Sequence, residues 1–175
     1  RGFDAIFMRT GTVKPKKPDI PGRNLKGVRQ AVYFLRKVSL YNEGNIARED
    51  VPIQEGDRVF VIGCGNQAMD GARTAIRMGA KDVEIVYHRT VNEMSALRSE
   101  YEEAVEEGVK FNWQSKIVEI LDKDGILNGV VIEHNGERRT EKADKVLMAI
   151  GSVPASRVVS TTKGIEVDES GYVLT

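Results

Sequence analysis

The feature that most constrains this sequence is a glycine-rich turn between an apolar run and a helix-like segment. Residues 58–68 read RVFVIGCGNQA, which predicts a buried strand bounded by Gly63 and a helix from residue 66. The pattern Gly63-x-Gly65-x-x-Ala68 is typical of a dinucleotide-binding turn. The first glycine permits the tight bend, and the second lets backbone N–H groups approach a pyrophosphate. The small third residue allows close packing of helix on strand.

The order of strand, turn and helix gives this motif its weight, because a glycine pattern without that context is weak. A pyrophosphate on such a turn lies at the helix N-terminus, where free N–H groups and the helix dipole favour an anion. A purely structural glycine-rich turn is the alternative interpretation.

The end of the next predicted strand, VEIVY at 83–87, indicates which dinucleotide is bound. An NAD site needs an acidic residue about 20 residues beyond the fingerprint, whereas this strand ends in Tyr87-His88-Arg89-Thr90. Arg89 is suited to a 2′-phosphate through charge-assisted hydrogen bonds, so NADPH is favoured over NADH. The missing acid also argues against S-adenosylmethionine. The alternative for Arg89 is an exposed surface cation without a ligand. For His88 three roles stay open: stacking on adenine, contact with the phosphate, or exposure to solvent.

The remaining pattern predicts an α/β fold. Apolar spacing predicts helices over 28–41, over 66–79, and from the capping-box residues Thr90 and Glu93 to Gly108. Short apolar runs predict strands at 4–8, 83–87 and 145–151, besides the one before Gly63. After Gly108, turns at Asp124-Gly125 and Asn135-Gly136 indicate hairpins. The expected fold is therefore a Rossmann-like, three-layer NAD(P)-binding domain with a parallel sheet and a β-meander.

One residue spacing that occurs twice in the chain suggests a second dinucleotide fold. Two sets of residues share one spacing: Asp4, Met8, Gly11 and Val13, and Asp144, Met148, Gly151 and Val153. Two strands that each run into a glycine at the same spacing suggest two related dinucleotide folds. The middle of the chain lies between these two glycines. Two unrelated buried strands are the alternative.

Composition narrows the function classes. The chain has 175 residues, 26 Lys+Arg and 26 Asp+Glu, and no apolar run long enough to cross a bilayer. Zero net charge argues against nucleic acid or an anionic membrane as a partner. One cysteine and two histidines leave no intrachain disulfide, Cys-x-x-Cys pair, cysteine-ligated iron–sulfur cluster or zinc site. We therefore expect a cytoplasmic protein with no metal site.

Three further features are expected to be structural. Cys64 is a small packing residue inside the turn, and His134 is solvated beside the Asn135-Gly136 turn. The glutamates between residues 100 and 107 form a solvated helix face, preceded by an i,i+4 ion pair between Arg98 and Glu102.

The stretch 59–96, VFVIGCGNQAMDGARTAIRMGAKDVEIVYHRTVNEMSA, and EEGVKF at 106–111 resemble a known family. That family is the NADPH domain of the glutamate synthase small subunit (beta chain). It includes the matching parts of dihydropyrimidine dehydrogenase and of electron-bifurcating ferredoxin–NADP oxidoreductases. PDIPG at 18–22 is similar to the family's Ile-Pro-Gly crossover, and VLMAIGSVP at 146–154 to its second glycine exit. The resemblance covers nearly the whole chain.

The resemblance implies an NADPH domain inserted into an FAD domain, with hydride passing from nicotinamide to FAD and then to iron–sulfur clusters. It implies an NADP-binding domain at 28–151, with 1–27 and 152–175 as crossovers, partial segments of an FAD domain. The pyrophosphate would be held by Gly63, Gly65, Asn66, Gln67 and Ala68. Arg89 and Arg98 would meet the 2′-phosphate with His88 beside them, and Gly151 would lie near the nicotinamide. No catalytic acid–base residue is expected.

The sequence departs from the family pattern in three places. His88 replaces the first residue of an Arg-Arg pair, Arg9-Thr10-Gly11 replaces Ala-Thr-Gly, and there is no second fingerprint for FAD. We therefore expect part of a longer NADPH-dependent flavoprotein oxidoreductase, without its FAD domain and its larger subunit or iron–sulfur acceptor. Another flavoprotein of two dinucleotide domains is an alternative, although a thioredoxin-reductase-like one would need Cys-x-x-Cys. A non-catalytic nucleotide-binding or assembly module is the other.

Overall fold

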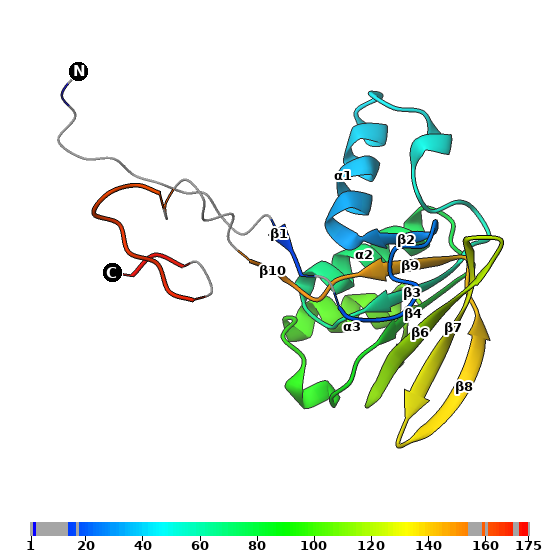
Figure 1. Cartoon of the computed structure of the whole chain (residues 1–175). Helices are drawn as coiled ribbons and strands as arrows, with labels where there is room; N and C mark the ends of the chain where they lie inside the picture. The colour runs from blue at the N-terminus through cyan, green and yellow to red at the C-terminus, as the bar shows by residue number, and fades with distance from the viewer. Residues whose placement is uncertain are drawn as a thin grey trace. The chain divides into compact units, whose positions relative to one another are not determined.

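The computed structural model describes residues 2, 14–16, 18–153, 159, 161–169 and 172–174, and the chain divides into two compact units. The larger unit spans residues 17–150 and holds the main sheet and the meander (Figure 1). The smaller unit combines residues 1–16 and 151–175. In it, β1 (Lys14–Pro15) pairs antiparallel with β10 (Ser152–Val153). The predicted strand at 4–8 lies outside the described residues, and so does the first of the two residue sets that share one spacing.

A parallel five-stranded sheet is the centre of the larger unit. Its order is β2 (Val28–Gln30), β9 (Lys145–Met148), β3 (Arg58–Ile62), β4 (Asp82–Val86) and β5 (Lys110–Asn112). Every neighbouring pair is parallel, so the carboxyl ends of all five strands lie at one edge. The glycine turn after β3 and the His88-Arg89 segment after β4 are therefore brought to the same edge.

Helices cover one face of this sheet and the meander covers the other (Figure 1). The helices are α1 (Ala31–Asn42), α2 (Asn66–Arg77) and α3 (Arg98–Glu106), with 3-10 turns at Arg48–Asp50 and Val91–Glu93. Along β3, Val59 and Val61 pack in the helix-side core, whereas Phe60 packs in the meander-side core. The predicted three-layer α/β fold is confirmed.

The meander consists of β6 (Ser115–Lys123), β7 (Ile126–His134) and β8 (Glu137–Lys142). Its turns have positive φ at both central residues, 56° and 76° at Asp124-Gly125 and 50° and 84° at Asn135-Gly136. That conformation suits the twist of two antiparallel strands and explains the aspartate or asparagine followed by glycine. The predicted hairpins are confirmed.

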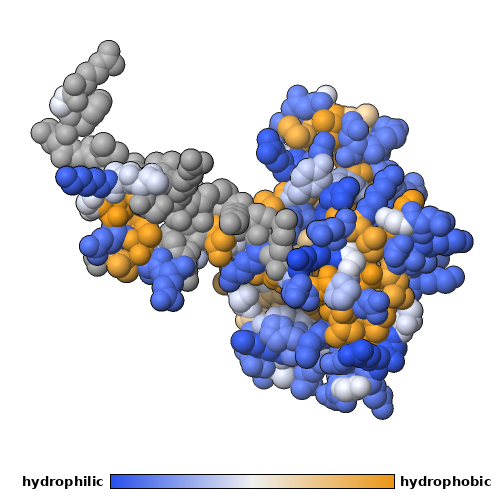
Figure 2. Space-filling view, viewed as in Figure 1, coloured by the Kyte–Doolittle hydropathy of each residue, from blue (hydrophilic) through white to orange (hydrophobic). Residues whose placement is uncertain are grey.

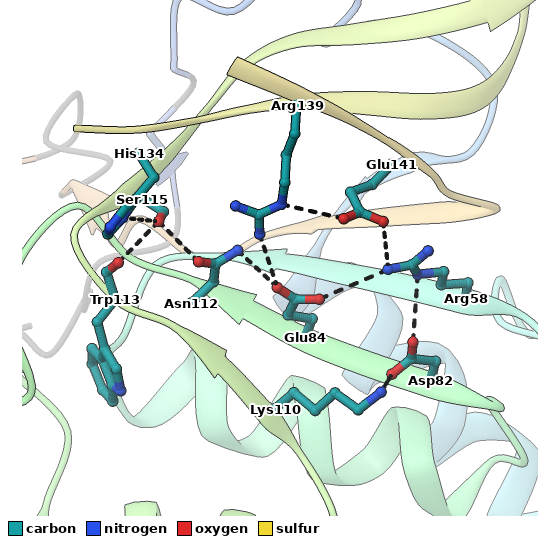
Figure 3. A network of polar contacts seen from close by, with 10 residues as sticks. All are labelled: Arg58, Asp82, Glu84, Lys110, Asn112, Trp113, Ser115, His134, Arg139 and Glu141. Carbon is teal, nitrogen blue, oxygen red and sulfur yellow. Dashed lines mark hydrogen bonds and ion pairs between the residues drawn. The ribbon is translucent and has the colours of Figure 1, made fainter. Parts of the chain in front are cut away.

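A polar network links the meander to the amino half of β4 (Figure 3). Glu84 accepts a hydrogen bond of 2.8 Å from Asn112 and lies 3.9 Å from the guanidinium groups of both Arg58 and Arg139. Glu141 of β8 lies 2.9 Å from Arg58. Because the carboxylates and arginines come from both sheets, the network joins the two layers through charged contacts as well as apolar burial.

The same network corrects the expectation for His134. Its ring is half-buried, and Nδ1 lies 3.0 Å from Oγ of Ser115, whose side chain is in turn 2.9 Å from Oδ1 of Asn112 (Figure 3). The turn residues Asn135 and Gly136 are exposed, but His134 before them bonds to Ser115 of the neighbouring strand β6, and Ser115 in turn bonds to Asn112 of β5. His134 is therefore a half-buried structural residue of the meander rather than a solvated side chain.

Two predicted helix starts are wrong for identifiable reasons. Val28 fits the helical spacing, yet residues 28–30 form edge strand β2, because Val28 pairs with Val146 of β9 and packs in the meander-side core. The capping box of Thr90 and Glu93 is present but caps only a 3-10 turn. The chain is then extended at Met94 and Leu97, and α3 begins at Arg98.

Figure 2 shows mostly hydrophilic residues on the visible face of the larger unit, interrupted by smaller apolar patches. One exposed apolar side chain is Leu97 at the start of α3, which is 61% exposed. Within the described part of the chain, no helix combines the length and apolar character needed to cross a bilayer.

Candidate dinucleotide-binding site

The turn after β3 depends on the first glycine of the fingerprint. Gly63 is buried and has φ of +116°, a conformation that side chains disfavour. A Cβ atom at this position would also clash with the carbonyl oxygen of Ala149. Its own N–H donates to the carbonyl of Val86 over 3.2 Å, so the turn begins level with the end of β4.

The start of α2 presents free backbone donors. Gly65 is the N-cap, and its carbonyl accepts from the N–H groups of Ala68 and Met69 at 2.8 and 3.2 Å. Among the described residues, the N–H groups of Gly65, Asn66 and Gln67 meet no acceptor. Ala68 is fully buried, which explains the requirement for a small residue there. The arrangement suits an anion at the helix N-terminus.

The segment 94–97, which precedes α3, lies directly against the glycine turn. Ala96 N–H donates to the carbonyl of Cys64 over 3.1 Å, and Leu97 N–H donates to Oδ1 of Asn66 over 2.9 Å. Oγ of Ser95 lies 3.1 Å from where a Cβ on Gly65 would be. These contacts hold the starts of α2 and α3 together, and sequence reasoning missed them. The small pair Ser95-Ala96 is the signal that could have indicated a close approach.

His88 and Arg89 follow β4 at this edge, and both are exposed. The Arg89 side chain makes no hydrogen bond or ion pair within the described residues, while the His88 ring contacts Tyr87 edge-on at 5.0 Å. The nearby carboxylate of Glu93 is engaged by Thr90, whose N–H and hydroxyl lie 3.1 and 2.8 Å away. Hydrogen bonds from Thr90, backbone first, lower the pKa of Glu93, with smaller effects of Arg89 and His88.

Arg98, the first residue of α3, already has partners. Its Nε lies 3.0 Å from Glu102, which confirms the predicted i,i+4 pair, and its guanidinium lies 5.1 Å from the centre of the Tyr101 ring. The side chain is nevertheless 64% exposed. Arg98 thus begins the helix that segment 94–97 attaches to the glycine turn, and it remains accessible to a ligand.

The acidic face of α3 differs from the expectation. Glu100 and Glu107 lie 2.9 and 2.8 Å from Arg73 of α2, and Glu107 also pairs with Arg77. Glu103 completes this group on Arg73. Hydrogen bonding to Arg77, followed by Arg73, lowers the pKa of Glu107. Most of the acidic run is therefore an ion-paired contact between helices rather than a solvated face.

Two residues named in the sequence analysis remain, Cys64 and Gly151. Cys64 is buried, and burial raises the pKa of its thiol to about 12, so it is protonated at neutral pH, as expected of a packing residue. Gly151 belongs to the smaller unit, where its carbonyl accepts from Lys16 N–H over 3.0 Å. Its assignment to the nicotinamide side stays a prediction.

Comparison with solved structures identifies the class of fold. Thioredoxin reductase from T. acidophilum superposes with a TM-score of 0.72 at 20% identity, covering 93% of this chain and 49% of that one. The Lactococcus lactis enzyme gives 0.71 at 24% identity, over 93% and 49% of the two chains. At these identities the similarity establishes the fold alone.

The sequence establishes the family. The profile described as pyridine nucleotide-disulphide oxidoreductase matches residues 2–175, and the chain belongs to this family. It is 35% identical to the glutamate synthase [NADPH] small chain of Halomonas elongata, over 98% of this chain and 40% of that protein. The Escherichia coli small chain is 32% identical, with 98% and 41% covered. The NADPH-Fe(3+) oxidoreductase subunit beta of Geobacter sulfurreducens is 30% identical, with 99% and 28% covered. The chain thus spans about two fifths or less of these relatives, and the predicted resemblance to the small chain is confirmed.

Proposed function

We propose that this chain is the NADPH-binding domain of a flavin-dependent oxidoreductase similar to the glutamate synthase small chain. The proposal rests on one observation made among the described residues. Free N–H groups at the start of α2 occur at the same sheet edge as Arg89, which follows β4 and makes no ion pair. The former suit a pyrophosphate, and the latter suits a 2′-phosphate. We assign Gly63, Gly65, Asn66, Gln67 and Ala68 to the pyrophosphate turn. The free N–H groups of Gly65, Asn66 and Gln67 are its donors, whereas Gly63 and Ala68, whose N–H groups are bonded within the protein, shape the turn and its packing.

The electrostatics favour NADPH over NADH at this edge. A carboxylate at the end of β4 would bind ribose hydroxyls and repel a 2′-phosphate, but His88 and Arg89 stand there. Glu93 is the next acidic residue after Arg89, and the Thr90 capping box already satisfies it. We assign Arg98 as the second cation for the phosphate, and His88 to a place beside these two arginines.

The domain assignment follows from the same proposal. Residues 28–151 would form the NADP-binding domain, and 1–27 and 152–175 would be crossovers to an FAD domain. When NADPH and FAD are both bound, nicotinamide would supply hydride to the flavin. The contribution of this chain is to bind and orient the nucleotide, with Gly151 on the nicotinamide side, and it needs no acid–base residue for that step. A larger subunit or an iron–sulfur protein would receive the electrons, in the cytoplasm.

Calorimetric titration of the chain with NADPH and with NADH tests the proposal, using the wild type and Arg89→Ala. Each charge-assisted hydrogen bond contributes about 1.5–3 kcal/mol, so the variant should lose about 10- to 200-fold in NADPH affinity. Affinity for NADH should be nearly unchanged. Arg36→Ala is the matched control, because Arg36 is another exposed arginine without an ion pair among the described residues.

The result that supports the proposal is an NADPH affinity that falls toward the NADH value in Arg89→Ala but not in Arg36→Ala. Equal affinities of the wild type for the two nucleotides would contradict the NADPH assignment. An equal loss in Arg36→Ala would show a general charge effect instead of a phosphate site.

A further inference from the structure

Asn66 joins two elements that are separated by about thirty residues in the sequence. Its Oδ1 accepts the N–H of Leu97 over 2.9 Å, which ties the first residue of α2 to the N-cap of α3. Leucine has no side-chain acceptor, and α3 accordingly lacks a side-chain cap of its own. The start of α3 is therefore held from outside the helix, by a residue of the glycine turn.

This hydrogen bond also orients the amide of Asn66. The amide oxygen must face the Leu97 N–H, so the Nδ2 group points away from this hydrogen bond. Within the described residues Nδ2 donates to no acceptor, and the side chain as a whole is exposed. The amide thus has its acceptor directed to the protein and its donor available to an anionic ligand.

We propose that Asn66 is a positioning residue that sets selectivity for NADPH, an inference that rests on the proposed function above. By holding Leu97 N–H, it fixes the first turn of α3, and with it Arg98, relative to the pyrophosphate turn. Its Nδ2 donates to the pyrophosphate. One amide therefore connects the part of the site shared by NADPH and NADH to the part that only the 2′-phosphate uses.

Substitutions at Asn66 separate the two roles. Asn66→Ala removes both the acceptor and the donor, so the start of α3 loses its external hydrogen bond. The ratio of NADPH to NADH affinity should fall about threefold to tenfold, the range expected for one such bond. Asn66→Asp keeps an acceptor for Leu97 but replaces the donor by a negative charge. It should weaken both nucleotides by similar factors and preserve their ratio.

The measurement combines calorimetric affinities with hydrogen exchange of the Leu97 amide, followed by NMR without nucleotide. Exchange should accelerate in Asn66→Ala and stay slow in Asn66→Asp. Asn92→Ala is the matched control, because Asn92 is exposed in the 91–93 turn and its side chain makes no hydrogen bond among the described residues. It should change neither readout. If Asn66→Ala does not fold, Asn66→Asp still tests the inference: a changed NADPH-to-NADH ratio while the exchange of Leu97 stays slow would overturn it.

The outcomes distinguish this inference from the proposed function. A wild type that prefers NADPH, with an unchanged ratio in Asn66→Ala, would overturn the role of Asn66 and leave the NADPH assignment intact. Unchanged exchange of Leu97 in that variant would overturn it equally. A wild type with equal affinities would overturn both. A reduced ratio together with faster exchange, confined to Asn66→Ala, supports the inference.

Discussion

The two ends of β4 use charge in opposite ways. At the amino end, Asp82 and Glu84 lie within ion-pairing distance of cations, among them Arg58 at 3.5 and 3.9 Å and Lys110 at 2.8 Å (Figure 3). At the carboxyl end, His88 and Arg89 are exposed, and Arg89 has no ion pair within the described part of the chain. Charges at the first end join the meander to the sheet, whereas we propose that those at the second bind a ligand.

The comparison shows that the surroundings of an arginine decide its role. Arg58 begins strand β3 and Arg89 follows the neighbouring strand β4, but only Arg58 meets carboxylates from β4 and β8. An unpaired exposed cation is ordinary on a protein surface. Arg89 differs from an ordinary one by its place, at the edge where α2 begins with free N–H groups.

Removal of the paired arginine is expected to have the largest effect. Arg58→Met leaves Glu84 and Glu141 with fewer cations, and loss of one partner of a buried pair costs about 3–5 kcal/mol. Because the Arg58 side chain is 30% exposed, we expect a smaller loss of about 2 kcal/mol in the free energy of unfolding. Urea denaturation measures it. Arg139→Met, in the same network but more exposed, should cost less. A parallel loss of NADPH affinity would show that the two ends of β4 are not independent.

The pH dependence of stability tests the paired end further. Burial, the largest cause, raises the pKa of Glu84 in the folded protein, against the opposing effects of Asn112, Arg139 and Arg58. The folded state therefore binds this proton more tightly than the unfolded state, so stability declines as pH rises from the unfolded pKa through the folded pKa. The substitution Glu84→Gln removes this titration, because a glutamine amide neither gains nor loses a proton over that range.

Glu84→Gln should accordingly gain stability relative to the wild type as pH rises from about 4 to 7, taking the usual glutamate pKa as reference. Denaturation of both proteins at several pH values measures the difference. If Glu84→Gln instead lost stability relative to the wild type over this range, the arginines would outweigh burial in setting the pKa of Glu84. Glu137→Gln on the exposed part of β8 is the matched control, and an equal trend there would assign the effect to the loss of a charge rather than to burial at Glu84.

The sequence was most informative where local and tertiary preferences agree. Strand β3, the glycine turn and α2 follow from one motif, because the apolar run, the turn residues and the helix pattern indicate the same structure. The meander turns were predictable for the same reason, since Asp-Gly and Asn-Gly adopt the left-handed conformation that the hairpins need.

The errors arose where distant contacts decide the conformation. Val28 shares its spacing with the apolar residues of α1, but its side chain packs on the opposite face of the sheet. Helical periodicity also runs through 94–97, yet Ala96 and Leu97 donate their N–H groups to the glycine turn instead of to the preceding turn of a helix. Neither contact has a sequence signal of its own that fixes the partner.

The candidate site was predictable as a set of residues but not as an arrangement. The fingerprint, His88 and Arg89 follow from strand ends that share an edge. The additional bond of Asn66 to Leu97 was not predictable, nor was the pairing of α3 glutamates with Arg73, because both depend on how two helices meet. Motifs indicate which residues face a ligand, whereas packing determines which of them are already occupied.

Arg98 lies between the two extremes of the comparison, and it supports the smallest prediction. It is paired with Glu102 at 3.0 Å, but both side chains are more than half exposed, at 64% and 60%. Such a surface pair contributes about 0.2–1 kcal/mol, so Glu102→Gln should free Arg98 and raise NADPH affinity by about twofold. Affinity for NADH should stay the same, because NADH lacks the 2′-phosphate. Calorimetry should include Glu106→Gln, an exposed glutamate one turn further along α3 without a hydrogen bond among the described residues. An equal gain in that control would assign the effect to net charge. A loss of NADPH affinity in Glu102→Gln would mean that Glu102 orients Arg98 toward the phosphate instead of competing with the phosphate for Arg98.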